Sequence, residues 1–148
     1  MSSWDEVRTA IPTLAAEVEA RFRGHKHHTM ATVRPDGGPR ISGTEVEFAD
    51  GQLRLGMMTG TLRAADLHRD PRIALHSHCV DPPADDHTAW VGEAKIAGRV
   101  IWLEGGEDHD AVAIDVEHIV LTAVGDPPDH LLIESWTPSG GAKRIQRY

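Results

Sequence analysis

A short turn before a predicted helix carries residue types that suit an anion site. Thr59, Gly60 and Thr61 follow a β-rich run, and Thr61 occupies the N-cap position of a helix expected over residues 62–68. Backbone N–H groups are unpaired at the start of a helix, and Arg63 lies one residue inside it. Guanidinium and N–H groups both donate hydrogen bonds to phosphate. The stretch therefore predicts a phosphate site, and the alternative is an ordinary turn with a solvated arginine.

Histidines form a second group of candidates. Three of them lie within residues 25–28, and His76 and His78 share one face of a later strand while Cys79 points to the other. Imidazole and thiolate groups bind zinc, but the spacing matches no standard zinc motif. Residues 25–28 also follow a helix end, where cations are favoured. We therefore expect no metal site, and we interpret Cys79 as a core or interface residue.

The elements that position these residues are mostly strands. Alternating apolar residues indicate the strands, and Asp50-Gly51 is a strong hairpin signal. Gly43 and Gly98 lie inside long predicted strands, where glycine suits a barrel corner. We expect a helix over residues 3–22 broken at Pro12, strands over 28–34, 40–48 and 52–58, a helix over 62–68, and strands from Ile73 and over 92–104, 113–124 and 131–137. Many strands with short turns and little helix predict an antiparallel barrel or sandwich, of which we favour a barrel.

Composition sets outer limits on function. A chain of 148 residues predicts a single domain over residues 1–148. The net charge of −8 argues against nucleic acid as a partner. No apolar run approaches the roughly 18 residues that span a membrane. We therefore expect no membrane partner. A single cysteine excludes an intrachain disulfide framework, so we expect a cytoplasmic protein.

Three segments, taken in order, resemble the pyridoxamine 5′-phosphate oxidase-like family of flavin-binding split barrels. They are ATVRPDGGPR, DGQLRLGMMTGTLRAADLHRDPRIAL and the closing WTPSGGAKRIQRY. The resemblance covers residues 4–148 and implies a mainly β fold: a split antiparallel β-barrel with an N-terminal helix and a short helix between strands three and four. It also implies a homodimer that binds FMN, or in some branches a deazaflavin coenzyme, at the subunit interface.

The same resemblance implies which residues contact the cofactor. The strand from Ile73 would line the isoalloxazine ring, which makes His76 or His78 a candidate. The closing segment of the other subunit would bring Trp136 and Arg144 near the ring. The implied phosphate ligands are Arg40, Met58, Thr59, Thr61 and Arg63.

The expected function is that of an FMN- or deazaflavin-dependent oxidoreductase acting on a small molecule, with no catalytic residue assigned. Leu62 and Glu45 occupy positions at which a cation would help to hold the phosphate of FMN. The longer anionic tail of a deazaflavin would instead suit an extended basic strip. That strip would comprise Arg40, Arg63, Lys143, Arg144 and Arg147. FMN is the first expectation and deazaflavin the alternative. The alternatives to an enzyme are a non-enzymatic flavin or haem carrier and a degenerate dimeric scaffold.

Overall fold

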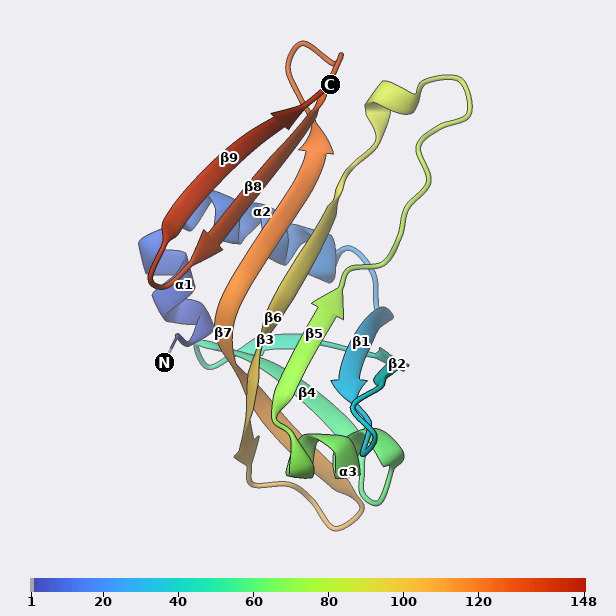
Figure 1. Cartoon of the computed structure of the whole chain (residues 1–148), viewed down its shortest axis with the longest axis vertical. Coiled ribbons are helices and arrows are strands. Elements are labelled where there is room, and N and C mark those ends of the chain that lie inside the picture. The colour runs from blue at the N-terminus through green and yellow to red at the C-terminus, as the bar shows by residue number, and fades with distance from the viewer. Residues whose placement is uncertain (1) are drawn as a thin grey trace.

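The computed structural model describes residues 2–148, which form a nine-stranded antiparallel sheet and three α-helices (Figure 1). The elements are α1 (Trp4–Ala10), α2 (Pro12–Arg23), β1 (His28–Val33), β2 (Pro39–Thr44), β3 (Glu47–Ala49), β4 (Gln52–Met58), α3 (Leu62–Arg69), β5 (Arg72–His76), the short 3₁₀ helix η1 (His87–Ala89), β6 (Glu93–Leu103), β7 (His109–Val124), β8 (Leu131–Thr137) and β9 (Gly141–Arg147).

The order of the strands shows why the barrel is split. Neighbouring strands follow the path β2-β1-β5-β6-β7-β4-β3, and β8 pairs with β7 and β9. β2 and β3 lie at opposite ends of this path, yet only Glu45 and Val46 separate them in the chain. The sheet must therefore curl until its two edges approach each other. The predicted mainly β, split-barrel fold is confirmed.

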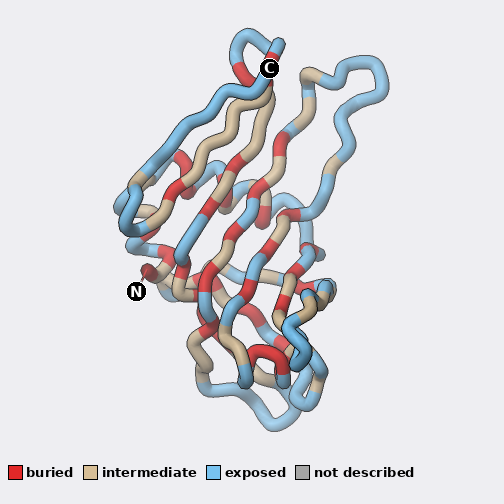
Figure 2. The backbone as a smooth tube through the Cα atoms, in the orientation of Figure 1, coloured by how far each residue is buried: buried red, intermediate tan, exposed pale blue. Residues whose placement is uncertain are grey.

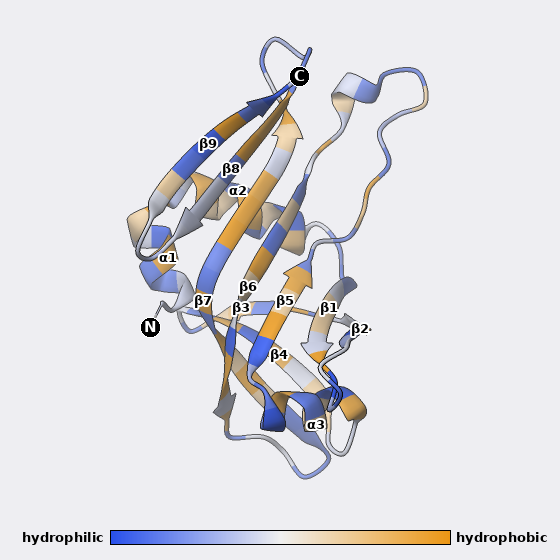
Figure 3. Ribbon diagram, in the orientation of Figure 1, coloured by the Kyte–Doolittle hydropathy of each residue, from blue (hydrophilic) through white to orange (hydrophobic). Residues whose placement is uncertain are grey.

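Alternation along the strands places the core inside the barrel. Leu53, Leu55 and Met57 of β4 are buried, as their spacing predicted. Ile96 and Val100 of β6 are also buried, because alternate residues of a strand share one face. Figure 2 shows buried and exposed positions alternating along most strands. Figure 3 shows hydrophobic residues concentrated in the central strands, whereas β9 is mostly hydrophilic.

The N-terminal helices cover this core. The hydroxyl of Ser3 caps α1 by accepting a hydrogen bond from the Glu6 N–H at 3.2 Å. The predicted break at Pro12 is confirmed, because α2 begins there. α2 contacts β6 and β7, and its buried residues include Val18 and Phe22. No helix within residues 2–148 has the length and apolar character needed to cross a bilayer.

Three boundaries differ from the sequence-based expectation. The strand expected over residues 40–48 is two strands, because the chain leaves one sheet edge at Thr44 and joins the other at Glu47. β7 begins at His109, before the expected residue 113, because polar residues there pair with β4. The basic tail forms β9, which pairs with β8 through its backbone although its side chains are mostly exposed. The local pattern of apolar residues does not indicate the crossing between the sheet edges or the pairing of β7 with β4, because both depend on segments that are distant in the chain. It does not indicate β9 because most side chains of this strand are exposed.

Gly98 is required by a bulge between β6 and β7. The register of the two strands shifts between Ala97 and Gly98, and a Cβ atom added at Gly98 would collide with the carbonyl oxygen of Asp115. A Cβ atom added at Gly43 would meet no atom within 4 Å. The barrel bend therefore depends on Gly98 rather than on both predicted corner glycines.

We expect Gly98→Ala to lower the free energy of unfolding by about 1–3 kcal/mol, because the strands must separate to admit the methyl group. Urea denaturation at a fixed protein concentration measures the change. Gly43→Ala is the matched control and should stay within about 0.5 kcal/mol of the unmodified protein. Equal losses in the two variants would contradict the role given to the bulge.

Candidate functional site

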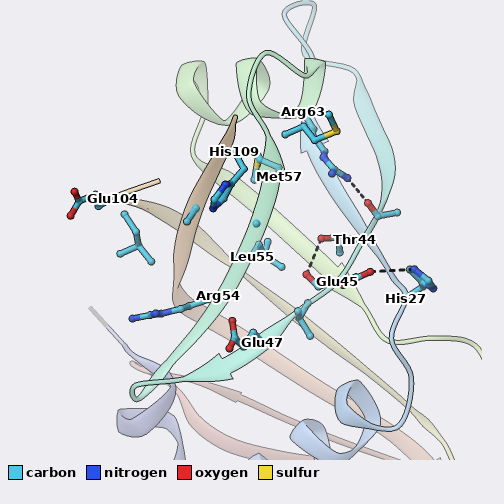
Figure 4. Close-up of a pocket in the computed structure, with 16 residues that line it drawn as sticks. His27, Thr44, Glu45, Glu47, Arg54, Leu55, Met57, Arg63, Glu104 and His109 are labelled. Atoms are coloured by element: carbon cyan, nitrogen blue, oxygen red, sulfur yellow. Dashed lines mark hydrogen bonds and ion pairs between the residues drawn. The ribbon is translucent and has the colours of Figure 1, made fainter. Parts of the chain in front are cut away.

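A cleft of about 1000 Å³ lies where the barrel is split (Figure 4). Its walls are residues 43–47, which connect β2 and β3, residues 54–58 of β4, and Arg63 of α3. The end of β6 and the start of β7 close it with Leu103, Glu104, His109 and Ala111. This volume is at the upper end of the range of small-molecule sites. The gap between the sheet edges is therefore large enough for a cofactor.

Arg63 is the cation of this cleft that other side chains leave unbalanced. It donates a hydrogen bond to the carbonyl oxygen of Gly43, which links α3 to β2 (Figure 4). Among residues 2–148 it makes no ion pair. Arg54, which lines the same cleft, lies 3.3 Å from Asp50. Arg63 therefore has a full positive charge to offer an anionic ligand.

The turn before α3 has the geometry that the sequence predicted. The Thr61 hydroxyl caps the helix by accepting a hydrogen bond from the Ala64 N–H at 3.3 Å. Gly60 has a φ of +82°, a conformation that favours glycine. The Thr59 N–H donates to the carbonyl oxygen of Asp108 at 3.1 Å, which ties the turn to the start of β7. These contacts fix the turn that leads from the end of β4 into α3.

Of the residues predicted to bind a cofactor, Met58 and Arg63 line the cleft, and Thr59 and Thr61 lie in the turn between them. The Met58 side chain is 70 % exposed, which is unusual for a large apolar residue. Arg40 does not line the cleft. Four of the five predicted phosphate ligands therefore fall in one short segment beside it.

Arg40 instead binds a buried carboxylate. Asp66 of α3 is 1 % exposed and accepts hydrogen bonds from the Thr32 hydroxyl at 2.7 Å, from Arg40 Nε at 2.7 Å and from Arg69 Nη2 at 3.2 Å. The hydrogen bond from Arg40 is the largest cause that lowers the pKa of Asp66 to about 2, against the opposing effect of burial. This network fixes α3 to β1 and β2.

Acidic side chains also line the cleft, and Glu45 is the one that sequence reasoning identified. Its carboxylate lies 3.4 Å from His27 Nε2 and 3.8 Å from Lys26 Nζ. The Lys26 ammonium group offsets part of its charge. Glu47 and Glu104 are further lining residues. The cleft is therefore mixed in charge, with Arg63 at the end that α3 supplies.

The remaining predicted residues lie elsewhere in the chain. His76 is on the outer face of the sheet, Trp136 is buried in the core, and Arg144 of β9 lies 3.4 Å from Glu134. Figure 1 shows β9 far from α3, so the proposed basic strip is not continuous within one chain. Any approach of Trp136 or Arg144 to a cofactor would require a second subunit, which stays a prediction.

The histidines near the end of α2 are structural. Nε2 of His28 lies 2.8 Å from the Phe22 carbonyl oxygen, and its Nδ1 accepts a hydrogen bond from the His78 N–H at 2.9 Å. Burial is the largest cause that lowers the pKa of His28. The rings of His25 and His78 stack with centroids 4.2 Å apart. These contacts join β1 to the segment after β5 and leave His28 unavailable to a metal ion.

Sequence reasoning did not identify several cleft residues. Arg54, Glu104 and His109 come from three separate strands or their ends, and only the topology brings them together. His109 pairs with Met58 in the β4–β7 ladder. A prediction that β7 begins at residue 109 would have placed His109 beside Met58, but no local pattern indicates that boundary.

No family model matches the chain, and no curated protein matches its sequence. Solved structures do share its fold. A pyridoxamine 5′-phosphate oxidase-related, FMN-binding protein from Nostoc punctiforme matches 93 % of this chain and 96 % of its own, with a TM-score of 0.66 and 11 % identity. PhzG from Burkholderia lata, solved with tetrahydrophenazine-1-carboxylic acid, matches 95 % and 90 %, with a TM-score of 0.67 and 11 % identity. A heme binding protein from Mycobacterium smegmatis matches 89 % and 87 %, with a TM-score of 0.58 and 14 % identity.

These likenesses define the fold as that of the pyridoxamine 5′-phosphate oxidase-related split barrels. The resemblance found in the sequence is thereby confirmed at the level of fold. Identities of 11–14 % do not carry a ligand or an activity from one protein to the other.

We expect the free energy of unfolding of Asp66→Asn to depend much less on pH between about 2 and 4 than that of the unmodified protein. The folded-state pKa of about 2 lies below the usual 3.8, so the stabilisation is complete above about pH 4 and is lost as the pH falls toward 2. It is on the order of 2 kcal/mol. Denaturant unfolding between pH 2 and 6 measures the difference between the two proteins.

Glu117→Gln is the control, because Glu117 pairs with Arg99 at the surface, where both side chains are about half exposed. It should leave the same acid limb nearly unchanged. Parallel stability curves for Asp66→Asn and the unmodified protein would contradict the buried network.

Proposed function

We propose that this protein binds FMN in the cleft at the barrel split and acts as a flavin-dependent oxidoreductase on a small molecule. The observation that carries the proposal is the position of Arg63. Its unbalanced charge lies at the start of α3, beside the exposed N–H groups and threonine hydroxyls of the preceding turn. A terminal phosphate is the group that this arrangement suits.

The residues present fit the rest of such a ligand. Val46, Met58 and Leu103 supply apolar surface to the cleft, against which a planar ring system packs. Glu45 would repel a phosphate, but Lys26, whose Nζ lies 3.8 Å from its carboxylate, offsets part of this charge. The FMN-binding protein of the same fold from Nostoc punctiforme supports the assignment.

Bound FMN would supply the redox chemistry, and the chain would bind and orient it. Arg63 and the turn before α3 would hold the phosphate. Met58, whose side chain is 70 % exposed, would exclude water from part of the ring. No side chain is assigned to proton transfer.

A deazaflavin coenzyme is the alternative ligand, and the structure supports it less. Its longer anionic tail would call for an extended basic strip. Within one chain Arg40 is bound by Asp66 and Arg144 by Glu134, and β9 lies apart from α3. The compact anion site at Arg63 favours a single phosphate.

We expect the protein to form a homodimer through the outer face of its sheet. The strand register aligns a row of small or apolar residues across neighbouring strands, and Ile41, at its end, is 75 % exposed. The row comprises Ile41, Ala31, Ala74 and Ala97. Small side chains leave a flat surface on which a second copy can pack closely.

The absorbance spectrum of the purified protein and FMN titration of the apoprotein test the proposed ligand. We expect a flavin spectrum or stoichiometric uptake of FMN, and turnover of the reduced flavin with an added electron acceptor would support an enzyme. Flavin binding without turnover would favour a carrier, and an intense haem band would favour a haem carrier. A colourless protein that takes up no flavin would indicate a degenerate scaffold and contradict the proposal.

We expect Arg63→Ala to weaken FMN binding by roughly ten- to a hundredfold. A hydrogen bond to a charged group contributes about 1.5–3 kcal/mol, and the variant loses it. Arg63→Lys keeps the charge and should retain much of the affinity. Fluorescence titration with FMN measures the dissociation constants.

Arg8→Ala is the matched control, because Arg8 lies on α1 and pairs with Asp5 and Glu19 away from the cleft. Its dissociation constant should equal that of the unmodified protein. Unchanged affinity in a folded Arg63→Ala variant would refute the phosphate site.

We expect Ala74→Glu to convert the dimer to monomers at micromolar concentration, because paired copies would bury a carboxylate in a flat apolar surface. Sedimentation velocity measures the mass. Ala16→Glu, at an exposed position of α2, is the control and should remain dimeric. A monomeric unmodified protein would rule out this surface as an interface.

A further inference from the structure

Three metal-ligating side chains of different types meet on the outer face of the sheet, outside the cleft. His76 ends β5, Glu93 begins β6, and Cys79 lies in the loop that joins the two strands. One ligand atom from each lies within 4.8 Å of those of the other two. The cluster therefore closes the base of a long loop with an imidazole, a thiol and a carboxylate.

The pair of His76 and Glu93 needs a positive charge between its facing atoms. His76 Nδ1 lies 2.6 Å from the carbonyl oxygen of Ser77, a contact in which the ring nitrogen must donate its hydrogen. In the neutral ring Nε2 then carries a lone pair. This atom lies 3.2 Å from Glu93 Oε2, which also accepts. Two acceptors at this distance repel each other unless a proton or a metal ion lies between them.

The separation of the two atoms fits a metal ion as well as a proton. Ligand atoms bound to a tetrahedral zinc ion at about 2.0–2.3 Å lie roughly 3.3–3.8 Å apart. The separation of 3.2 Å between His76 Nε2 and Glu93 Oε2 is close to this range. The hydrogen bond from Nδ1 to a backbone carbonyl is also the contact that commonly orients a metal-binding histidine.

Cys79 would complete a set of three protein ligands. Its Sγ lies 3.9 Å from His76 Nδ1, and its side chain is exposed, so it can turn toward Nε2 without disturbing the core. Lys95, the ladder partner of His76, is exposed and can keep its ammonium group in solvent. A thiolate with imidazole and carboxylate is a ligand set that suits Zn²⁺.

We propose that His76, Cys79 and Glu93 bind one Zn²⁺ ion, which pins the loop between β5 and β6 at its base. The loop is already joined there by two hydrogen bonds, from the Ser77 N–H to the Ala94 carbonyl at 2.9 Å and from the Ala94 N–H to the Ser77 hydroxyl at 3.0 Å. A bound metal ion would add a cross-link between Glu93 of β6 and Cys79 in the first part of the loop. This role is independent of the flavin site.

Titration of the metal-free full-length protein with Co²⁺, a spectroscopic substitute for Zn²⁺, tests the site. We expect one equivalent to bind with a thiolate-to-cobalt charge-transfer band, and Zn²⁺ to displace it. Cys79→Ser should abolish the band. Glu93→Gln and His76→Gln should each weaken binding about tenfold or more, because each loses a ligand. His118→Gln, on the same sheet face, is the control and should bind as the unmodified protein does.

Alkylation gives a second readout, since Cys79 is the only cysteine of the chain. Zn²⁺ should slow its reaction with iodoacetamide in the unmodified protein and in His118→Gln, but much less in Glu93→Gln. The proposal is overturned if Co²⁺ gives no charge-transfer band, or if the band and its affinity survive in Glu93→Gln and His76→Gln. In that outcome a proton, not a metal, joins His76 to Glu93.

Discussion

The buried carboxylate of Asp66 is the contact on which the candidate site depends. It draws Thr32 of β1, Arg40 of β2 and Arg69 of α3 to one point beneath the helix. Removing the carboxylate would leave the mostly buried guanidinium of Arg40 without its ion pair, which is unfavourable. The network therefore holds α3 against one edge of the split. Because the helix is fixed there, Arg63 reaches the Gly43 carbonyl and faces the cleft.

The cleft is a consequence of the sheet geometry. Glu45 and Val46 carry the chain from one sheet edge to the other, and the two edges do not close on each other. The cleft takes its walls from both edges and its cation from α3. Ion pairs with Lys26 and Asp50 partly offset the charges of Glu45 and Arg54, whereas Arg63 makes no ion pair within residues 2–148.

The sequence was sufficient for features that arise within short segments. It predicted the Thr61 cap and the helix break at Pro12, and its resemblance to a known family predicted the fold. It could not predict contacts between distant segments. Asp66 and Arg40 are 26 residues apart in the chain, and nothing local indicates that they pair. The same holds for Glu93, which register alone brings beside His76.

A crystal structure of the protein grown with FMN most directly tests the proposal that a monophosphate flavin binds at the barrel split. We expect the phosphate to accept hydrogen bonds from Arg63 and from backbone N–H groups in the first turn of α3, with the ring along the cleft. A phosphate bound at β9 or at another surface, with the cleft empty, would contradict it.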